Sequence, residues 1–313
     1  MDNEEQPSNF SHASINEPIS YTLTWRMRIT YLYAPILAMV FSLFITLLIV
    51  IANPFLDIGI FPPLTNLYET IIALLVIALV GGVATFATFL VFQRGSETLH
   101  RIIIAAFISP LFFILTVFIG QAIFLVLLFQ GLTNLHLSMI ALASIMFSAF
   151  SMVFIFTDAL GMMGRNVLFT IYGIILGVFI ATNFTWVISM ALLVILAIQD
   201  TIFAIRLGPT IVDADPQRHA RAAFTFVIGP LIIGVGDLIV YAALVSYALR
   251  YVGWTFAILT FAAVLTGCLI NTQIVVKRPN QVIPGLPIPL LCALLPISIG
   301  LALIFLGFGG VFL

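Results

Sequence analysis

Long apolar runs, separated by short polar stretches, fill almost the whole chain after its first 25 residues. Most of these runs have about 20 residues or more, the length that an α-helix needs to cross about 30 Å of hydrocarbon. The pattern therefore predicts an all-α polytopic membrane protein with nine transmembrane helices. The predicted spans are residues 29–53, 67–92, 102–130, 137–157, 166–182, 184–206, 222–249, 251–274 and 288–313.

The boundary between the fifth and sixth spans depends on a short turn signal, Ala181-Thr182-Asn183. One uninterrupted helix from Val167 to Arg206 would be about 60 Å long at 1.5 Å per residue. That length is twice the thickness of the hydrocarbon layer. We therefore expect a tight hairpin that divides this stretch into two spans.

The basic residues indicate the orientation of the spans, because lysine and arginine concentrate in short cytoplasmic loops. With the N-terminus placed in the cytoplasm, ten of the eleven basic residues fall on the cytoplasmic side, and Arg250 alone falls outside. Nine spans then place the C-terminus outside. Residues 1–25 are polar and acidic, which is typical of a flexible tail, and residues 26–313 form a single transmembrane domain.

Composition supports lipid as the solvent of this chain. Hydrophobic residues make up 63% of the sequence and charged residues 7%, with a mean hydropathy of +1.26. So little polar surface cannot coat a water-soluble globule, so membrane lipid is an expected partner. The net charge of −1 leaves no basic patch for nucleic acid. Cys268 and Cys292 both lie in apolar segments, which favours neither a disulfide framework nor a metal site.

Ten of the twelve acidic residues lie in the tail, in loops or at the ends of predicted spans. The other two lie deeper within spans, where an ionised carboxylate is costly and commonly marks function. They are Asp200 and Asp237. Asp158 lies near Gly161 and Arg165, and we interpret it as part of a solvated helix end. All four histidines lie in the tail or in loops, and no HExxH motif is present, so no metal site is expected.

The depths of the two aspartates agree only if span seven starts late. Asp200 lies six residues before the end of its span, or about 9 Å from the cytoplasmic end. Counted from Ala222, Asp237 would lie about 22 Å deep. A helix that begins at Pro230, a residue favoured at the first helical position, would bring Asp237 to about 10 Å. We therefore expect a helix start at Pro230, preceded by an extended segment at 222–228.

Glycine precedes the second aspartate twice, at Gly234 and Gly236. Each costs roughly 1 kcal/mol in a helix interior relative to alanine. Close packing between membrane helices explains such residues by itself. Beside a buried aspartate, they also allow a substrate or a neighbouring backbone to approach the carboxylate.

At these positions the chain resembles the presenilin and signal peptide peptidase family of intramembrane aspartyl proteases. Gly234-Val235-Gly236-Asp237 resembles the GxGD motif of that family, and Asp200 is similar to the aspartate of its sixth helix. Pro284-Gly285-Leu286-Pro287 is similar to its Pro-Ala-Leu motif, and the nine-span topology also matches. Two positions differ, because Gln199 stands where the family usually has tyrosine and Gly285 where it has alanine. The short loop after span six is typical of a compact, archaeal-type homologue.

The resemblance implies an aspartic endopeptidase of the GxGD type that hydrolyses peptide bonds within the transmembrane segments of other membrane proteins. Asp200 and Asp237 would form the catalytic dyad and would share one proton, with water as the second substrate and no cofactor or metal. The expected location is the cell membrane, if the organism is a prokaryote. The substrate-binding residues implied by the resemblance are Gly234, Gly236, Pro284, Gly285 and Leu286.

Three prolines, Pro284, Pro287 and Pro289, predict a non-helical stretch before span nine whose carbonyl groups are free. By analogy with the family, the 284–286 loop and the 222–228 segment would bind an extended substrate by strand addition.

Three other functions are compatible with parts of the pattern. The strongest alternative is a proton- or cation-coupled secondary transporter with Asp200 and Asp237 as ion-binding carboxylates. More than about 10 Å between the two carboxylates would favour it. Prepilin peptidases also use GxGD, but they usually continue with a polar stretch, whereas residues 238–241 here are Leu-Ile-Val-Tyr. A purely structural scaffold would leave the buried acids unexplained.

Overall fold

The computed structural model describes residues 25–52, 68, 71–72, 75, 79, 97–128, 132–157, 159, 161–212, 225–228, 231–277 and 284–308. Several expectations from the sequence lie outside these residues. They concern the tail before residue 25, most of the predicted span at 67–92, Asp158, and the Gly229-Pro230 break.

The described residues form eight α-helices and one two-stranded sheet. The helices are α1 (Trp25–Ala52), α3 (Glu97–Leu128), α4 (Asn134–Thr157), α5 (Met162–Asn183), α6 (Trp186–Val212), α8 (Val235–Tyr251), α9 (Trp254–Lys277) and α10 (Pro287–Leu303), with a π-helical turn at Ile304–Phe308. Six of the helices, α1, α3, α4, α5, α9 and α10, are long and apolar enough to cross a membrane. The prediction of a helical, multi-pass membrane protein is thereby confirmed.

The predicted hairpin between the fifth and sixth spans is present, with the first helix ending one residue later and the second beginning two residues later than predicted. Helix α5 ends at Asn183 and α6 begins at Trp186. The Ser189 hydroxyl donates a hydrogen bond to the Ile180 carbonyl (3.0 Å), and the Tyr251 hydroxyl donates one to the Phe184 carbonyl (3.0 Å). The first bond joins α6 to α5, and the second ties the turn to the last residue of α8.

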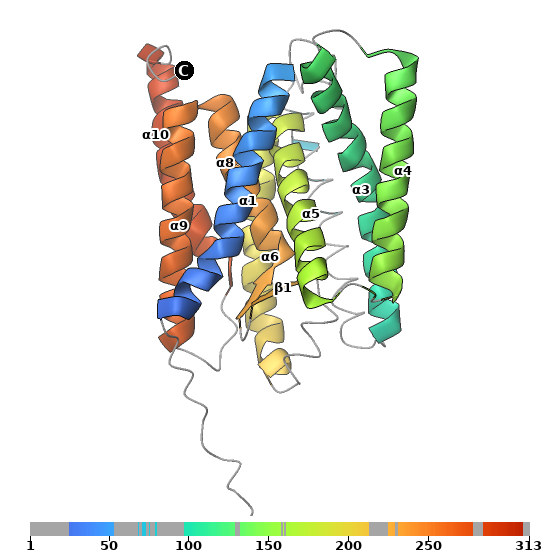
Figure 1. Cartoon of the computed structure of the whole chain (residues 1–313). Helices are drawn as coiled ribbons and strands as arrows, with labels where there is room; N and C mark the ends of the chain where they lie inside the picture. Colours follow the sequence, from blue (N-terminus) through green and yellow to red (C-terminus); the bar gives the residue numbers. More distant parts are fainter. Residues whose placement is uncertain are drawn as a thin grey trace, which may run out of the picture.

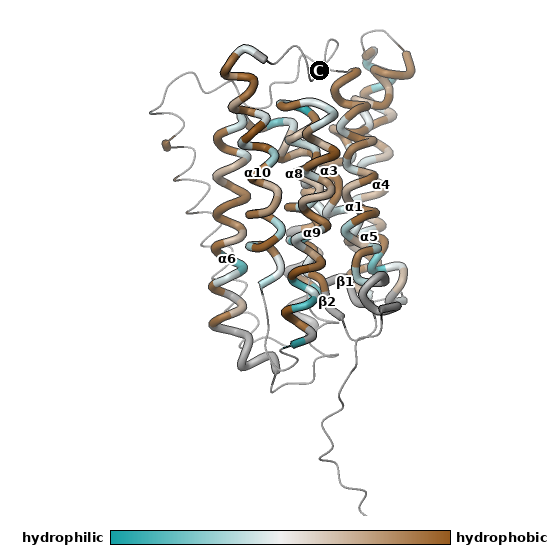
Figure 2. Tube along the Cα trace, turned by 90° about the vertical axis from the view of Figure 1, so that its left-hand side faces the viewer, coloured by the Kyte–Doolittle hydropathy of each residue, from teal (hydrophilic) through white to brown (hydrophobic). Residues whose placement is uncertain are grey.

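Helix α8 is the centre of the bundle. It packs against α1, α5, α9 and α10, whereas α3 and α4 form a pair at one side (Figure 1). Viewed from the side, hydrophobic positions run along the length of the labelled helices (Figure 2). The inner helices bury much of their surface against each other, while α4 leaves most of its apolar side chains exposed. A membrane supplies the solvent that such exposed residues require.

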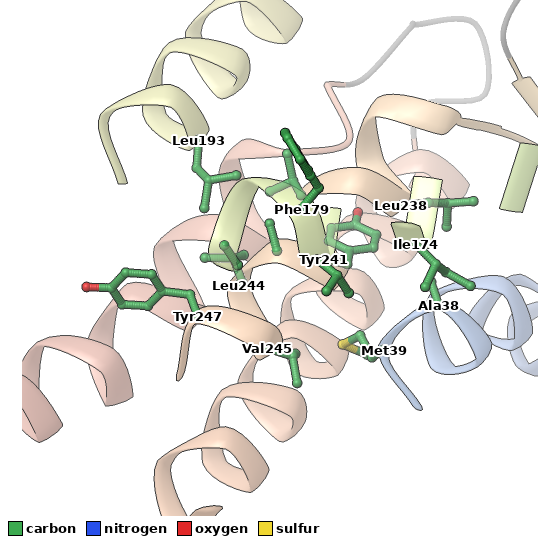
Figure 3. Close-up of a cluster of buried hydrophobic side chains, with 14 of the residues drawn as sticks. Ala38, Met39, Ile174, Phe179, Leu193, Leu238, Tyr241, Leu244, Val245 and Tyr247 are labelled. Atoms are coloured by element: carbon green, nitrogen blue, oxygen red, sulfur yellow. The ribbon is translucent and has the colours of Figure 1, made fainter. Parts of the chain in front are cut away.

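The central core is built around α8 (Figure 3). Leu238, Tyr241 and Leu244 are fully buried there. They meet Met39 from α1 and Leu193 from α6, which are equally buried. Side chains from three helices distant in sequence therefore fix the rotation of α8 about its axis.

Two glycines of α5 allow this helix to approach α8 closely. A Cβ atom on Gly177 would lie 2.8 Å from the Cβ of Ala242 and 2.9 Å from the backbone nitrogen of Ala243. A Cβ atom on Gly173 would lie 3.2 Å from the Cβ of Leu238. The spacing of four residues is the small-xxx-small pattern of close membrane-helix contacts. The contact holds the first half of α8, which carries Asp237.

A β-hairpin precedes α8, and it corrects the predicted start of that helix. Strand β1 (Thr225–Ile228) pairs in antiparallel register with β2 (Leu231–Gly234), so that Ile228 lies opposite Leu231. The expectation of a helix beginning at Pro230 was wrong, because α8 begins at Val235. Residues 231–233 are Leu-Ile-Ile, and their branched side chains suit a paired strand. The predicted extended segment is present at 225–228.

Helix α6 is longer than the predicted span, since it continues to Val212 and does not end at Arg206. Asp200 therefore lies about 18 Å from the end of the helix, at 1.5 Å per residue. The helix ends from which both depths were counted are therefore wrong, whereas the shared depth of about 10 Å stays a prediction. The positions of the two aspartates must be compared through the contacts that they make.

Candidate active site

Asp237 lies in the first turn of α8 and is 9% exposed. Its Oδ2 accepts a hydrogen bond from the backbone N–H of Gly234 (3.3 Å), the residue that caps the helix. A carboxylate in this position satisfies one of the unpaired N–H groups of a helix start and is stabilised by the helix dipole. Capping explains an acid here without any chemistry, so a function requires a second group nearby.

Asp200 is the second group, and it lies on the inward face of α6. Leu193, Ala197 and Ala204 are buried and lie on the same side of the helix at spacings of three and four residues. Asp200 itself is half-buried. Its Oδ2 accepts a hydrogen bond from the backbone N–H of Leu286, at 3.0 Å. The carboxylate is therefore directed at the residue just before α10.

The two carboxylates meet the chain at consecutive residues. A Cβ atom on Gly285 would lie 2.8 Å from the Cγ of Asp237 and 2.9 Å from its Oδ1, and closer still to Oδ2. Leu286, the next residue, donates to Asp200. The path from Asp237 to Asp200 runs through the contact with Gly285, the covalent bonds from Gly285 to the Leu286 nitrogen, and the Leu286 hydrogen bond. The sum of these distances limits the separation of the two carboxyl groups to at most about 10 Å. The structure thus brings together the two aspartates that the sequence singled out.

Gly285 is the position where glycine has a clear steric reason. A Cβ closer than 3.0 Å to the carboxylate carbon would force either the 284–286 loop or Asp237 to move. The glycine at this position, which differs from the alanine of the resembling family, is therefore matched to the way Asp237 sits in this chain. Sequence comparison alone gives no such reason.

The predicted non-helical stretch before α10 is present, but its carbonyl groups are not free. Pro284, Gly285 and Leu286 precede the helix, which begins at Pro287. The Gly285 carbonyl accepts a hydrogen bond from the Tyr241 hydroxyl at 3.2 Å. It also accepts one from Nδ2 of Asn271, at 2.9 Å. Asn271 also donates to the Pro284 carbonyl, at 3.1 Å. The expectation of free carbonyl groups was therefore wrong for both Pro284 and Gly285.

Sequence reasoning missed Asn271 and Tyr241 as neighbours of the site. Charged and metal-ligating residues supplied the candidates from the sequence, and amides and phenols within spans did not. The signal was available, because an asparagine in the apolar run of α9 needs hydrogen-bond partners in a membrane. Tyr241 follows Asp237 by four residues and so lies on the same side of α8.

The two glycines of the GxGD segment differ in their surroundings. A Cβ on Gly234 would lie 3.6 to 3.8 Å from the three terminal atoms of the Asp237 side chain, which is ordinary contact. Gly236 is exposed, and a Cβ there would meet no atom within 4 Å. Open space beside Gly236 is the feature that a substrate could use. The role of Gly234 is to cap α8 and to hydrogen-bond Asp237.

The hairpin leaves two strand edges next to the site. Strands β1 and β2 form a sheet of two strands, and each pairs only with the other among the described residues. Because β2 ends at Gly234, its free edge leads directly to Asp237. Unpaired strand edges accept an additional extended chain.

No set of three or more His, Cys, Asp or Glu side chains able to hold a metal ion occurs within the described part of the chain. The site as described consists of two carboxylates, a glycine-containing loop and a strand edge. Comparison with protein-family models, with curated proteins and with solved structures gives no match. The function is therefore inferred from the site itself.

Proposed function

We propose that this protein is an intramembrane aspartyl protease that uses Asp200 and Asp237 and one water molecule to hydrolyse peptide bonds in transmembrane segments. The observation that carries the proposal is the meeting of both carboxylates at Gly285-Leu286. Two carboxylates from different helices within about 10 Å, at one non-helical loop, provide the pair of groups that acid–base hydrolysis needs. The separation does not exceed the distance above which a transporter would be favoured.

In the proposed reaction, one carboxyl group acts as a general base and the other as a general acid. One ionised carboxylate accepts a proton from water, and the water oxygen adds to the carbon of the scissile carbonyl. The other carboxylic acid donates a hydrogen bond and then its proton to the carbonyl oxygen. As the tetrahedral intermediate collapses, the C–N bond breaks and the first carboxyl group gives its proton to the leaving nitrogen, while the second carboxylate takes a proton from one of the two hydroxyl groups of the intermediate. One water is consumed, and both carboxyl groups return to their initial states.

The substrate is proposed to bind as an extended chain. Helical peptide bonds are closed off by their own hydrogen bonds, so cleavage requires local unwinding. The free edge of β2 ends two residues before the open side of Gly236. A transmembrane segment added to this edge by backbone hydrogen bonds would reach Asp237 in an extended form.

The proposed topology is nine spans with the site near the cytoplasmic side. Figure 1 places the Trp25 end of α1, the Lys277 end of α9 and β1 at the same end of the bundle. Lys277 is the last residue of α9, and Arg250 lies at the opposite end of the neighbouring helix α8. This distribution supports the orientation expected from the basic residues, with Arg250 outside.

A cleavage assay in proteoliposomes tests the proposal. The purified protein is reconstituted with a peptide that contains one transmembrane helix, and the products are identified by mass spectrometry. Wild-type protein should cleave the peptide, whereas Asp200→Asn and Asp237→Asn should each lower the rate by at least about 1,000-fold, because the two groups act as a unit. Asp158→Asn, at an acid that the sequence predicts at a solvated helix end, is the matched control and should retain the rate.

Two outcomes would overturn the proposal. One is cleavage that persists in either dyad variant. The other is absence of cleavage together with proton-coupled uptake of a solute into vesicles, lost in both Asn variants. That result would establish the transporter, in which the same carboxylates carry protons or Na⁺. Binding of a peptide transition-state analogue of aspartyl proteases, abolished by both substitutions, would separate the two functions independently of substrate choice.

A further inference from the structure

Asn271 is a buried amide that reaches from α9 to the loop between the two carboxylates. The side chain is 2% exposed. Its Nδ2 donates to two consecutive carbonyl groups, those of Pro284 (3.1 Å) and Gly285 (2.9 Å). A primary amide nitrogen carries two N–H bonds, so each carbonyl receives one.

The peptide group between Gly285 and Leu286 is held on both of its sides. Its carbonyl oxygen accepts from Asn271 on α9 and from the Tyr241 hydroxyl on α8. Its N–H donates to Asp200 on α6. Because a trans peptide directs C=O and N–H in opposite directions, the donors and the carboxylate lie on opposite sides of this group. One peptide plane thus connects three helices at the point where the two aspartates meet.

We infer that Asn271 is a positioning residue for the aspartate pair. By holding two successive carbonyls, it fixes the Gly285-Leu286 peptide so that the Leu286 N–H points at Asp200 and the Gly285 backbone remains against Asp237. The consequence of this positioning for catalysis rests on the proposed function. The effect on the loop does not depend on it.

The chemistry of the site favours asparagine over the alternatives. The Oδ1 atom of Asn271 is buried and has no hydrogen-bond partner among the described residues, so the donor end alone accounts for the orientation of the amide. Leucine would leave the two carbonyls with only the Tyr241 donor, and aspartate would place a carboxylate oxygen against them. Bonds to two successive residues also fix the direction of a backbone, whereas one bond leaves it free to rotate.

Asn271→Leu is the test variant, and Thr272→Val is its matched control. Thr272 is the next residue and is equally buried, but its hydroxyl donates only to the Cys268 carbonyl of its own helix. Hydrogen exchange measured by mass spectrometry on the peptide 284–290 reports the loop directly. Pro284, Pro287 and Pro289 carry no amide hydrogen, so few positions contribute to the signal.

Asn271→Leu should accelerate hydrogen exchange in this peptide about tenfold. The variant loses two hydrogen bonds, and their net contribution changes the equilibrium constant for local opening of the loop by about tenfold or more. Thr272→Val should exchange as the wild type does. If Asn271→Leu does not fold, Asn271→Ser replaces it, with an intermediate acceleration expected from its single donor. Equal exchange in the wild type and the folded Asn271 variant would overturn the inference.

Kinetics distinguish positioning from general stabilisation. With rates expressed per site that binds the transition-state analogue, Asn271→Leu should lower kcat about tenfold or more and leave KM within about twofold. An unchanged kcat per site would overturn the positioning role even if the variant were less stable. If the wild type cleaves nothing, the proposed function fails, and hydrogen exchange still decides whether Asn271 holds the loop.

Discussion

Helices α8 and α4 are both largely apolar, but they have opposite environments. Thirteen of the 17 residues of α8 are buried, whereas the 24 residues of α4 include three that are buried, Ile140, Ser144 and Ser151. In water, hydrophobic residues are sorted to the inside, but lipid removes that driving force. The inner helix carries the buried acid Asp237, and two glycines of α5, Gly173 and Gly177, pack closely against it. Of these two helices, the more hydrophobic one is the outer one, so hydrophobicity does not mark the core.

Truncation of Leu244 tests the buried side of this comparison and should have the largest effect. Leu244 is fully buried on α8, where it meets Leu193 of α6 in Figure 3. Leu244→Ala should lower the free energy of unfolding by about 3 kcal/mol, because the cavity is surrounded by helices that cannot all move inward. Titration with SDS in mild detergent measures it. A loss below about 1 kcal/mol would show that α8 is not tightly packed.

Substitution of Gly177 tests whether small residues define the inner contacts. The added methyl of Gly177→Ala would meet Ala242 and Ala243 of α8 within 3.0 Å, so we expect a loss of about 2 kcal/mol from overpacking. Gly173→Ala should cost less, since its nearest neighbour would be 3.2 Å away. Gly161→Ala, which meets no atom within 4 Å, is the control. Equal losses in all three variants would contradict the close contact.

Gly285→Ala tests whether the contact between the 284–286 loop and Asp237 matters for the site, because it adds one methyl group and no charge or polar atom. The methyl group would press on the Asp237 carboxylate, and displacement of a catalytic group by about 1 Å costs up to about 100-fold in rate. We expect kcat/KM for peptide cleavage to fall between about tenfold and 100-fold, with the unfolding free energy little changed. Gly161→Ala, which lies outside the site and whose methyl would meet no atom within 4 Å, should keep the rate within a few-fold. A fully active Gly285→Ala would mean that the loop does not hold Asp237.

These contrasts show why the sequence predicted some features and not others. Apolar runs of membrane length predicted the spans, because the hydrocarbon thickness fixes the length of a helix. The residues Asp200 and Asp237 were predictable because charge is conspicuous in such runs. The start of α8 was not, since Gly229-Pro230 suits a helix start and a strand connection equally well. Strand pairing between 225–228 and 231–234 decided it.

The hydrogen bonds of the loop were equally beyond reach of the sequence. Proline indicates that a segment is not helical, but it does not say which side chains satisfy the carbonyl groups. Asn271 lies 13 residues before Pro284 and on another helix, so the contact depends on how α9 and α10 pack. A search for amides within apolar runs, and not only for acids, would have proposed it.

A pair of serines tests how strongly polar residues join outer helices. Ser109 on α3 and Ser148 on α4 donate to each other's carbonyl oxygens at 3.0 and 2.7 Å. Ser148→Ala should lower the unfolding free energy by about 0.6 kcal/mol, the mean for such bonds in membranes. Ser138→Ala is the control, because that hydroxyl bonds only within its own helix. A loss above about 2 kcal/mol would mean that α4 depends on this contact.

Leu142→Ala completes the comparison, because it repeats the Leu244→Ala change on α4. Leu142 is 62% exposed. An exposed leucine contacts lipid in the folded state and lipid or detergent in the unfolded state. Its truncation therefore leaves no cavity, and the free energy of transferring the side chain between the two states does not change. The unfolding free energy should change by less than about 0.5 kcal/mol. A loss close to that of Leu244→Ala would refute the outer position of α4, since it would require a packed partner over that face.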